Sequence, residues 1–581
     1  MKQTQLHNIY RILRMPFRHL PATVRLADYF DAHERRLVVM AIVVGAVVWG
    51  LAYSLKSLVH WLGHTTQHAL VEGPTPLLLF VPLVLGSLLV AWLVSYRASV
   101  VHYRDKQGHI HELLDVEGDG LERAIALYYA AEPQLERALL GKEGVDVRWT
   151  MPTLSLALRK FVATLITLGS GGSGGLEASV TLIGESMAVA LFKPRRPMAA
   201  SPWAQRLWQW WRARNADDLQ TAQLSGIAAA VATLLGAPLA AAFFAVEIMY
   251  RRRPVIEKLI YALIAALVAY FLSNIVSGGH TTIFEVEQPG RPPLAWSYYA
   301  AVSVMALFIS MVATYFRLVH ASFDRGFHHY LPNRWVRHVT GAIGTGAIAL
   351  VAMGLSGYGP ELILGTGESV IYAAMAGEVT LRVALIALVA KLFATLTTIT
   401  SGGSAGLLIP SLFFGTMVAV IVALLFGYAP LLLIIPAVTA TLVALVNVPL
   451  AAILLTVELF GAPYILPALV ALVVAMLLTH ETSVYRTQRE RDESREILPG
   501  YSVRRLPIPS SWAGRSLAQL GVRARFDVNV IGMIEAARTD QRILPHLPVQ
   551  KPLRVDDLLI VLGENEKLAA MEAAMQEESL R

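Results

Sequence analysis

Two glycine-rich stretches of this chain nearly repeat each other, and apolar segments of helical length flank both. Residues 160–176 read KFVATLITLGSGGSGGL and residues 391–407 read KLFATLTTITSGGSAGL, so 11 of the 17 positions are identical. Glycine breaks at corresponding places in the two halves of a membrane chain indicate a transporter whose binding site lies at those breaks. The repeat therefore predicts two related halves that meet at their glycine turns.

A second pair of segments indicates how the halves are oriented. Residues 236–247 (GAPLAAAFFAVE) and 447–458 (NVPLAAILLTVE) agree at six of 12 positions. Three arginines, Arg251 to Arg253, follow the first copy, whereas the uncharged residues 461–463 follow the second. Because basic residues collect on the cytoplasmic side, the two copies end on opposite faces of the membrane and form an inverted repeat. A parallel duplication or a chance similarity of apolar helices is the alternative.

The composition places the chain in a membrane. Mean hydropathy is +0.53 and charged residues make up 16%, against about 25% in soluble proteins. Several apolar runs approach the length of about 20 residues that crosses a bilayer: residues 37–59, 76–94, 259–275, 299–319 and 383–400. No cleavage site follows the first run, so we expect no cleaved signal peptide. The net charge of +7 comes from Lys and Arg beside apolar runs, which argues against a nucleic-acid partner.

The composition also changes along the chain, and these changes predict its domains. We expect a basic cytoplasmic segment on anionic lipid at 1–36 and an all-α membrane domain at 37–485, with repeat halves at about 76–277 and 295–480. A charged linker or helix extension should follow at 486–500, and a small α+β domain at 501–581. Within the membrane domain, residues 120–131 read as a helix and the basic, Trp-rich residues 193–214 as an interfacial loop. The absence of cysteine fits a bacterial inner membrane, with both termini cytoplasmic.

The glycine breaks suggest a chemistry. A helix that begins inside the bilayer exposes unpaired N–H groups and its positive dipole end, which an anion can satisfy. Glu177 follows the first break, and Leu408 stands at the equivalent point of the second. A carboxylate at a helix N-terminus binds the same donors as a halide, so Glu177 can plug the site and leave it on protonation. The alternative is a fixed carboxylate that only caps its helix.

These motifs resemble the CLC family of chloride channels and chloride/proton antiporters over residues 37–486. The gating motif GxEGP is met by residues 175–179 (GLEAS), and GxFxP by residues 406–410 (GLLIP). The helix APLAG…E matches residues 237–247, and the tyrosine after the last membrane helix matches Tyr485. The resemblance implies a homodimer with one anion pathway per subunit and Glu177 as external gate. It implies anion contacts at Gly175, Leu176, Gly406, Leu407, Leu408 and Tyr485.

Three departures from the family pattern bear on ion choice and coupling. Asp119 stands where GSGxP has its anion-binding serine, so it joins the implied anion-binding residues as an acidic exception. In the GxEGP match the Gly-Pro pair is replaced by Ala178 and Ser179, and in the GxFxP match the Phe is replaced by Leu408. Ile248 occupies the position of the antiporters' cytoplasmic-side proton glutamate, which resembles the channel branch. Its neighbour Glu247 could carry the proton instead, although a structural role at the helix end is the stronger expectation.

The C-terminal residues resemble the regulatory module of RCK and TrkA proteins, through residues 514–520, 528–531, 543–545 and 555–563. Such modules dimerise and often bind small molecules, so we expect either a regulatory ligand or a dimer-stabilising role there. Nothing in the sequence predicts a metal site, a cofactor or an enzyme's nucleophile–base pair.

The sequence thus predicts transport of chloride-like anions through a pathway gated by a protonatable glutamate, with proton coupling as an added possibility. Three alternatives remain open: a passive anion channel without proton coupling, a cation or cation-coupled transporter, and an anion sensor in which transport is vestigial.

Overall fold

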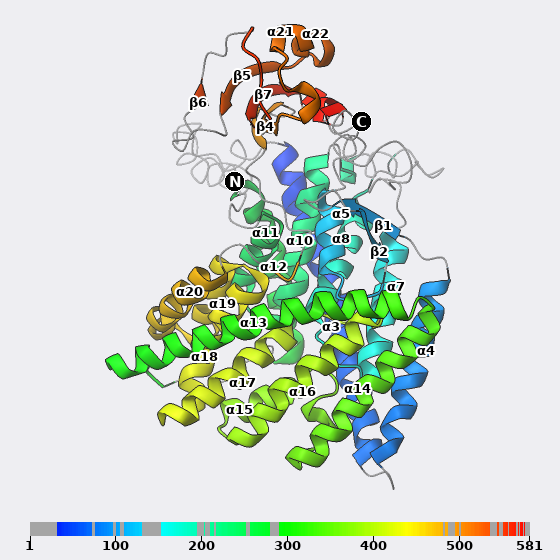
Figure 1. Ribbon diagram of the computed structural model, residues 1–581. Coiled ribbons are helices and arrows are strands. Elements are labelled where there is room, and N and C mark those ends of the chain that lie inside the picture. The colour runs from blue at the N-terminus through cyan, green and yellow to red at the C-terminus, as the bar shows by residue number, and fades with distance from the viewer. Residues whose placement is uncertain are drawn as a thin grey trace, which may run out of the picture.

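The protein is described by a computed structural model (Figure 1), a helical body with a small β-rich unit at one end. Residues placed well enough to describe are 32–71, 76–96, 100–104, 110–114, 116–129, 153–193, 203, 210–213, 216–250, 256–278, 290–479, 483–485, 494–498, 501–534, 543–544, 550–555, 557–564, 567–568, 570–572 and 574–575. Residues 1–31 of the basic segment expected at 1–36, most of the 193–214 insert and the charged residues 486–493 lie outside these ranges.

Within the described residues, the helical body shows two runs of eight α-helices. The first run is α3 (Ala32–Val71), α4 (Phe80–Ser95), α5 (Leu121–Tyr129), α7 (Thr153–Gly169), α8 (Glu177–Phe192), α10 (Ala216–Leu235), α11 (Pro238–Tyr250) and α12 (Ile256–Ser277). The second is α13 (Trp296–Tyr330), α14 (Arg334–Ser356), α15 (Glu368–Met375), α16 (Leu381–Thr400), α17 (Leu408–Phe426), α18 (Pro430–Thr441), α19 (Pro449–Phe460) and α20 (Ile465–Thr479). The predicted helix at 120–131 is α5, and a hairpin of β1 (Val100–Arg104) and β2 (Ile110–Leu114) precedes it.

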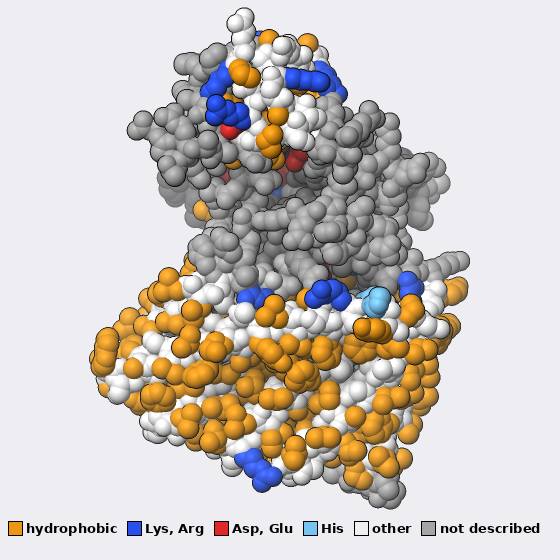
Figure 2. Space-filling view, viewed as in Figure 1, with side chains coloured by type: hydrophobic (Ala, Val, Ile, Leu, Met, Phe, Trp, Pro, Cys, Tyr) orange, Lys and Arg blue, Asp and Glu red, His pale blue; other side chains and the backbone are white. Residues whose placement is uncertain are grey.

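The body has the surface of a membrane protein. Among the described residues, eight helices are long and apolar enough to cross a bilayer. Figure 2 shows apolar side chains covering the visible face of the body, with a row of Lys, Arg and His side chains along its upper margin. Charged residues thus mark a boundary of the apolar surface, as at the edge of a hydrocarbon layer.

The two runs of helices pack in matching ways. Helix α3 packs against α7, α8, α10 and α12, and α13 packs against the corresponding helices α16, α17, α18 and α20. Helix α3 is therefore the counterpart of α13, and this packing starts the first half at α3, earlier than the expected start near residue 76. The sequence did not reveal that α3 corresponds to α13, because the two helices have equivalent packing partners but no common sequence motif.

Close contact between helices α8 and α10 depends on two glycines. A Cβ added to Gly226 would lie 2.3 Å from the carbonyl oxygen of Gly184, and one added to Gly184 would lie 2.5 Å from that of Gly226. Helices that approach this closely in a membrane do so through small residues. The contact fixes α8, whose first residue is Glu177, against the core of the first half.

The C-terminal unit is an antiparallel five-stranded sheet in the order β3-β4-β7-β5-β6. Its strands are β3 (Ser494–Leu498), β4 (Tyr501–Pro507), β5 (Asn529–Ile534), β6 (Ile543–Leu544) and β7 (Leu558–Glu564). Helices α21 (Leu517–Leu520) and α22 (Val522–Phe526) pack with the sheet around a core that includes the fully buried Trp512. Ser516 and Gln519 form the capping box of α21.

One boundary differs from the expectation. Residues 494–498 were expected in a charged linker, but they form β3, which pairs with β4 from Ser494 opposite Arg504 to Leu498 opposite Tyr501. The charged residues of this stretch suggested a linker, but charged residues are also common in edge strands.

Candidate functional site

The two glycine breaks meet directly inside the helical body. The Gly175 N–H donates to the Gly406 carbonyl at 2.7 Å, and the Gly406 N–H donates to the Gly175 carbonyl at 2.6 Å. These reciprocal bonds form an isolated antiparallel bridge. The predicted meeting of the two halves at their glycine turns is present in the structure.

A crossed set of hydroxyl contacts surrounds this bridge. The Ser173 N–H donates to Thr398 Oγ1 at 3.2 Å, and the Ser404 N–H donates to Thr167 Oγ1 at 3.1 Å. The same two serines also share side-chain hydrogen bonds with threonines of the opposite half, Ser173 with Thr395 at 3.1 Å and Ser404 with Thr164 at 3.0 Å. Helix α16, which precedes the second break, therefore binds the first break, and helix α7, which precedes the first break, binds the second.

Two helices begin at the bridge without side-chain caps. Leu176 is the N-cap of α8 and Leu407 is the N-cap of α17, and neither side chain can accept a hydrogen bond from the helix. Leu176, Leu407 and Leu408 are all buried. The first N–H groups of α8 and α17 are therefore available to an anion or a carboxylate.

The Glu177 carboxylate lies on one of these donors. Glu177 is the first residue of α8, is buried, and accepts a hydrogen bond through Oε2 from the Ile409 N–H of α17 at 3.3 Å. Its carboxylate also covers Gly175, where an added Cβ would lie 2.5 Å from Oε2. Glycine at 175 thus leaves room for the Glu177 carboxylate. This carboxylate belongs to the first half and reaches the N-terminus of α17 in the second half.

Asp119 lies in a glycine loop that has a counterpart in the second half. Its Oδ1 accepts from the Leu121 N–H at 2.8 Å. Lys160 Nζ, which is buried, donates to the carbonyls of Val116 and Gly118 at 3.2 and 2.8 Å. In the second half the buried Lys391 donates in the same way, to Ile363 at 2.9 Å and Gly365 at 2.7 Å. The loop GDG at 118–120 therefore corresponds to GTG at 365–367.

Tyr485 follows the second half and brings its hydroxyl to the carboxylates of the first half. Its hydroxyl lies within electrostatic range of Asp119 and Glu177, and its side chain is buried. The Val484 N–H donates to the Leu445 carbonyl at 3.0 Å, in the π-helical turn Leu442–Val446 that ends α18. The structure thus brings Glu177, Asp119, Tyr485 and the two glycine turns together.

The predicted proton residues Glu247 and Ile248 lie elsewhere. Glu247 accepts from the N–H groups of Leu450 and Ala451 at 3.1 and 2.9 Å, at the start of α19. Its repeat partner Glu458 accepts in the same way at the start of α11. Ile248 is buried in the apolar core. Glu247 therefore accepts from the first N–H groups of α19, in the position of a helix cap.

Several site features escaped the sequence reading. Lys160 and Lys391 open both copies of the 17-residue repeat, so their shared position was visible although their partners were not. The residues described contain no group of three or more His, Cys, Asp or Glu that could hold a metal ion. The donor set at the breaks consists of backbone N–H groups, which suits an anion.

Two protein-family models match the chain. The first, described as "Voltage gated chloride channel", matches residues 125–480, and the second, described as "TrkA-C domain", matches residues 502–576. The second match agrees with the resemblance found in the C-terminal residues.

Curated proteins and solved structures show the same likeness. The voltage-gated ClC-type chloride channel ClcB of Citrobacter koseri is 26% identical, over 57% of this chain and 75% of the relative. The H(+)/Cl(-) exchange transporter ClcA of Salmonella arizonae is 25% identical, over 77% of this chain and 86% of the relative. A CLC-type fluoride/proton antiporter and a slow cyanobacterial Cl-/H+ antiporter each align with a TM-score of 0.58 and 21% identity. The two alignments cover 79% and 78% of this chain, and 100% and 96% of the two solved chains, respectively. At 21% identity this shows a similar fold.

Proposed function

The chain belongs to the voltage-gated chloride channel family, and on this premise we propose that it carries small inorganic anions, chloride first among them, across a membrane. The observation that carries the proposal is the carboxylate of Glu177 bound to the Ile409 N–H at the start of α17. That carboxylate occupies a donor suited to an anion. An anion and the Glu177 side chain would therefore compete for one place.

Glu177 is the gate in this mechanism. While it is ionised, its carboxylate holds the α17 donor and blocks the pathway. When it takes up a proton it loses its charge, its attraction to the helix N-terminus weakens, and an anion can replace it. The anion would contact the N–H groups near Leu407 and Leu408, the glycine backbone at Gly175 and Gly406, and the Tyr485 hydroxyl.

Asp119 restricts the inner side of the pathway. A second carboxylate near the anion repels it, since two like charges about 4 Å apart oppose each other by about 1 kcal/mol in water and by more in a protein. Asp119 must therefore be protonated or turned aside when an anion passes. Transport then depends on protonation of Glu177 and on either the protonation or the position of Asp119.

A passive anion channel is the second candidate, and Ile248 favours it. The site that would hold a cytoplasmic proton glutamate carries a buried aliphatic side chain, and the neighbouring Glu247 is engaged in capping α19. In this case protonation of Glu177 opens the pathway, but no proton crosses with the anion.

The proposed assembly and surroundings follow from the family. We place the protein as a homodimer in a bacterial inner membrane with cytoplasmic termini, each subunit with its own pathway. The TrkA-C domain would bind a small regulatory ligand or strengthen the dimer.

The test is a flux measurement on purified protein in liposomes. Anion efflux and external pH are recorded together across chloride, nitrate, bicarbonate and fluoride, and reversal potentials are measured in asymmetric salt. Anion efflux with proton movement in the opposite direction supports exchange, and efflux without it supports the channel. A reversal potential set by cations contradicts anion transport, and specific anion binding without flux indicates a sensor.

A further inference from the structure

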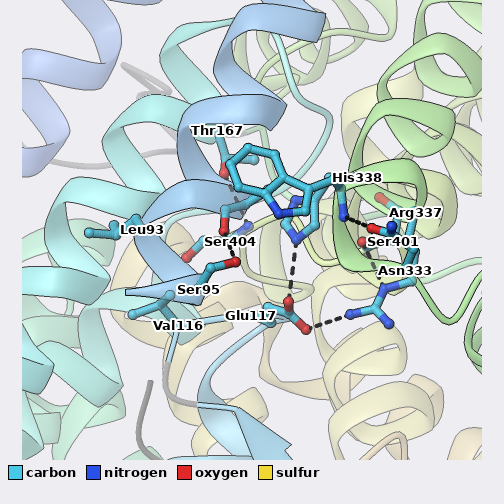
Figure 3. A network of polar contacts seen from close by, with 12 residues as sticks. Leu93, Ser95, Val116, Glu117, Thr167, Asn333, Arg337, His338, Ser401 and Ser404 are labelled. Atoms are coloured by element: carbon cyan, nitrogen blue, oxygen red, sulfur yellow. Dashed lines mark hydrogen bonds and ion pairs between the residues drawn. The ribbon is translucent and has the colours of Figure 1, made fainter. Parts of the chain in front are cut away.

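A buried cluster of three ionisable side chains lies beside the glycine loop of Asp119. Glu117 Oε2 pairs with the Arg337 guanidinium at 3.0 Å, and Glu117 Oε1 contacts His338 Nε2 at 3.3 Å. Arg337 and His338 stand in the first turns of α14. Figure 3 shows both of them directed at the one carboxylate. We call Glu117, Arg337 and His338 the Glu117 cluster.

The cluster holds more ionisable groups than an ion pair needs. The side chains of Glu117, Arg337 and His338 are only 9%, 4% and 1% exposed. Arg337 alone balances the charge of Glu117, so a buried histidine adds nothing to that balance. Ionisable side chains placed inside a membrane protein are costly, and they mark ion or proton pathways. Histidine is the side chain that changes charge most readily near neutral pH.

A small cavity lined by both apolar and hydroxyl-bearing residues adjoins His338. Its volume is about 30 Å³, and a cavity of about 10–15 Å³ already holds a water molecule. Hydroxyl groups dominate its polar lining, which α4, α7, α14 and α16 supply: Ser87, Thr167, Ser170, Thr345, Thr398 and Ser401. Among the described residues of this lining, His338 is the one with a titratable side chain. Hydroxyls and water both donate and accept hydrogen bonds, so they can pass a proton along.

The cavity and the cluster both reach the glycine breaks. Thr345 Oγ1 shares a hydrogen bond with Thr398 Oγ1 at 2.9 Å, and Thr398 Oγ1 accepts from the Ser173 N–H of the first break. The His338 ring lies on the second break, where a Cβ added to Gly402 would come within 2.3 Å of Nε2. Glycine at 402 is therefore required for this contact.

The charged groups facing the cluster come from three elements. Helix α14 supplies Arg337, the loop before α5 supplies Glu117 and Asp119, and α7 supplies Lys160, whose ammonium group binds the Gly118 carbonyl. The end of α13 carries Asp324 and Arg325, and the start of α14 carries Arg334 and Arg337, an excess of positive charge typical of the cytoplasmic side.

We propose that Glu117, His338 and the hydroxyl-lined cavity form a proton-binding site that carries protons from the cytoplasmic side to the glycine breaks. A proton from water binds the His338 imidazole, held by the Glu117 carboxylate. It leaves through the cavity hydroxyls and water for Glu177, and the imidazole returns to its neutral form. This inference rests on the proposed function, because Glu177 is the acceptor. It gives exchange a proton route that does not use residue 248.

The test uses the full chain in liposomes, with chloride efflux and proton uptake recorded together. His338→Gln keeps a hydrogen-bonding side chain but cannot take up a proton, and Glu117→Gln removes the carboxylate. We expect each to lower proton movement per chloride by about tenfold or more, the scale of a lost acid–base group, while chloride efflux continues. His33→Gln is the matched control, because His33 and Arg36 share Asp218 in a similar triad at 3.2 and 2.5 Å, between α3 and α10. It should leave the ratio unchanged.

Thr345→Val is a second variant that keeps the side-chain shape and all charges, and it should lower the same ratio. The inference is overturned if His338→Gln keeps the wild-type ratio, or if chloride and proton movement fall together, as for a purely structural ion pair. Wild-type protein that moves chloride without protons also overturns it and leaves anion transport standing. Wild-type protein that moves no anion contradicts the proposed function itself.

Discussion

Glu247 and Glu458 cap each other's helices across the two halves. Glu247, at the end of α11, accepts from the first N–H groups of α19, and Glu458, at the end of α19, accepts from those of α11. The distances agree in pairs, 3.1 and 2.9 Å in each half. Glu247 is buried whereas Glu458 is exposed, so one bond pattern serves two different environments.

This difference predicts unequal losses of stability. Glu247→Ala removes the acceptor of the buried Ala451 N–H and of the part-buried Leu450 N–H, and should lower the free energy of unfolding by about 1–3 kcal/mol. Glu458→Ala should cost less, because water can reach the freed groups. Thermal unfolding of the purified variants in detergent compares them. If Glu247→Ala unfolds like the wild type but loses proton coupling, Glu247 carries protons and is not mainly a cap.

Replacing Glu177 should remove the pH response of the pathway. Glu177→Gln keeps the shape of the side chain but cannot ionise, so external pH no longer decides whether it holds the Ile409 N–H. We expect chloride efflux that is nearly flat from acid to neutral external pH, with no accompanying proton movement. Efflux from liposomes at a series of external pH values measures this, with Glu458→Gln as control. A steep pH dependence that survives in Glu177→Gln would assign the gate to another group.

Asp119→Ser should strengthen anion binding. The change removes a carboxylate next to Tyr485 and supplies a hydroxyl that can donate to an anion. The relief of charge repulsion should tighten chloride binding by about tenfold, as measured by isothermal titration calorimetry in detergent at neutral pH. Unchanged affinity would mean that Asp119 is already neutral or does not face the anion.

The crossing of α8 and α10 should not tolerate a methyl group. Gly226→Ala places a Cβ 2.3 Å from the Gly184 carbonyl oxygen, and such overpacking costs about 1–3 kcal/mol. Gly354→Ala in α14 is the control, since its Cβ would meet nothing within 4 Å and alanine favours a helix by about 0.5–1 kcal/mol. Melting temperatures should fall for the first variant and hold or rise for the second. Equal melting temperatures would show that the two helices can separate without cost.

The sequence predicted the parts of the site that repeat strongly. The two glycine breaks and the place of Glu177 directly after the first of them follow from local patterns in residues 160–177 and 391–408, and the inverted halves follow from residues 236–253 and 447–463. It did not reveal that Glu177 bonds to Ile409, because that contact joins helices 232 positions apart. The pairing of GDG at 118–120 with GTG at 365–367 was also missed, since two glycines two positions apart are too common to stand out.

The Glu117 cluster was missed for a related reason. Glu117 and His338 lie 221 positions apart, and each alone resembles an ordinary charged residue near the end of an apolar run. Only the packing of α14 on the loop before α5 reveals that they share a buried place. Long-range polar contacts of this kind have no signature in local composition.

The exchange of contacts between Ser173 and Thr398, and between Ser404 and Thr167, bears on how the protein is made. The first half emerges from the ribosome while Thr398, which will accept from the Ser173 amide, is still unsynthesised. Until α16 arrives, that amide must be satisfied by water, lipid headgroups or an insertion factor, because hydrocarbon offers no acceptor. The transport pathway is therefore assembled last, and a protein truncated between the halves is expected to be recognised by quality-control proteases as incomplete.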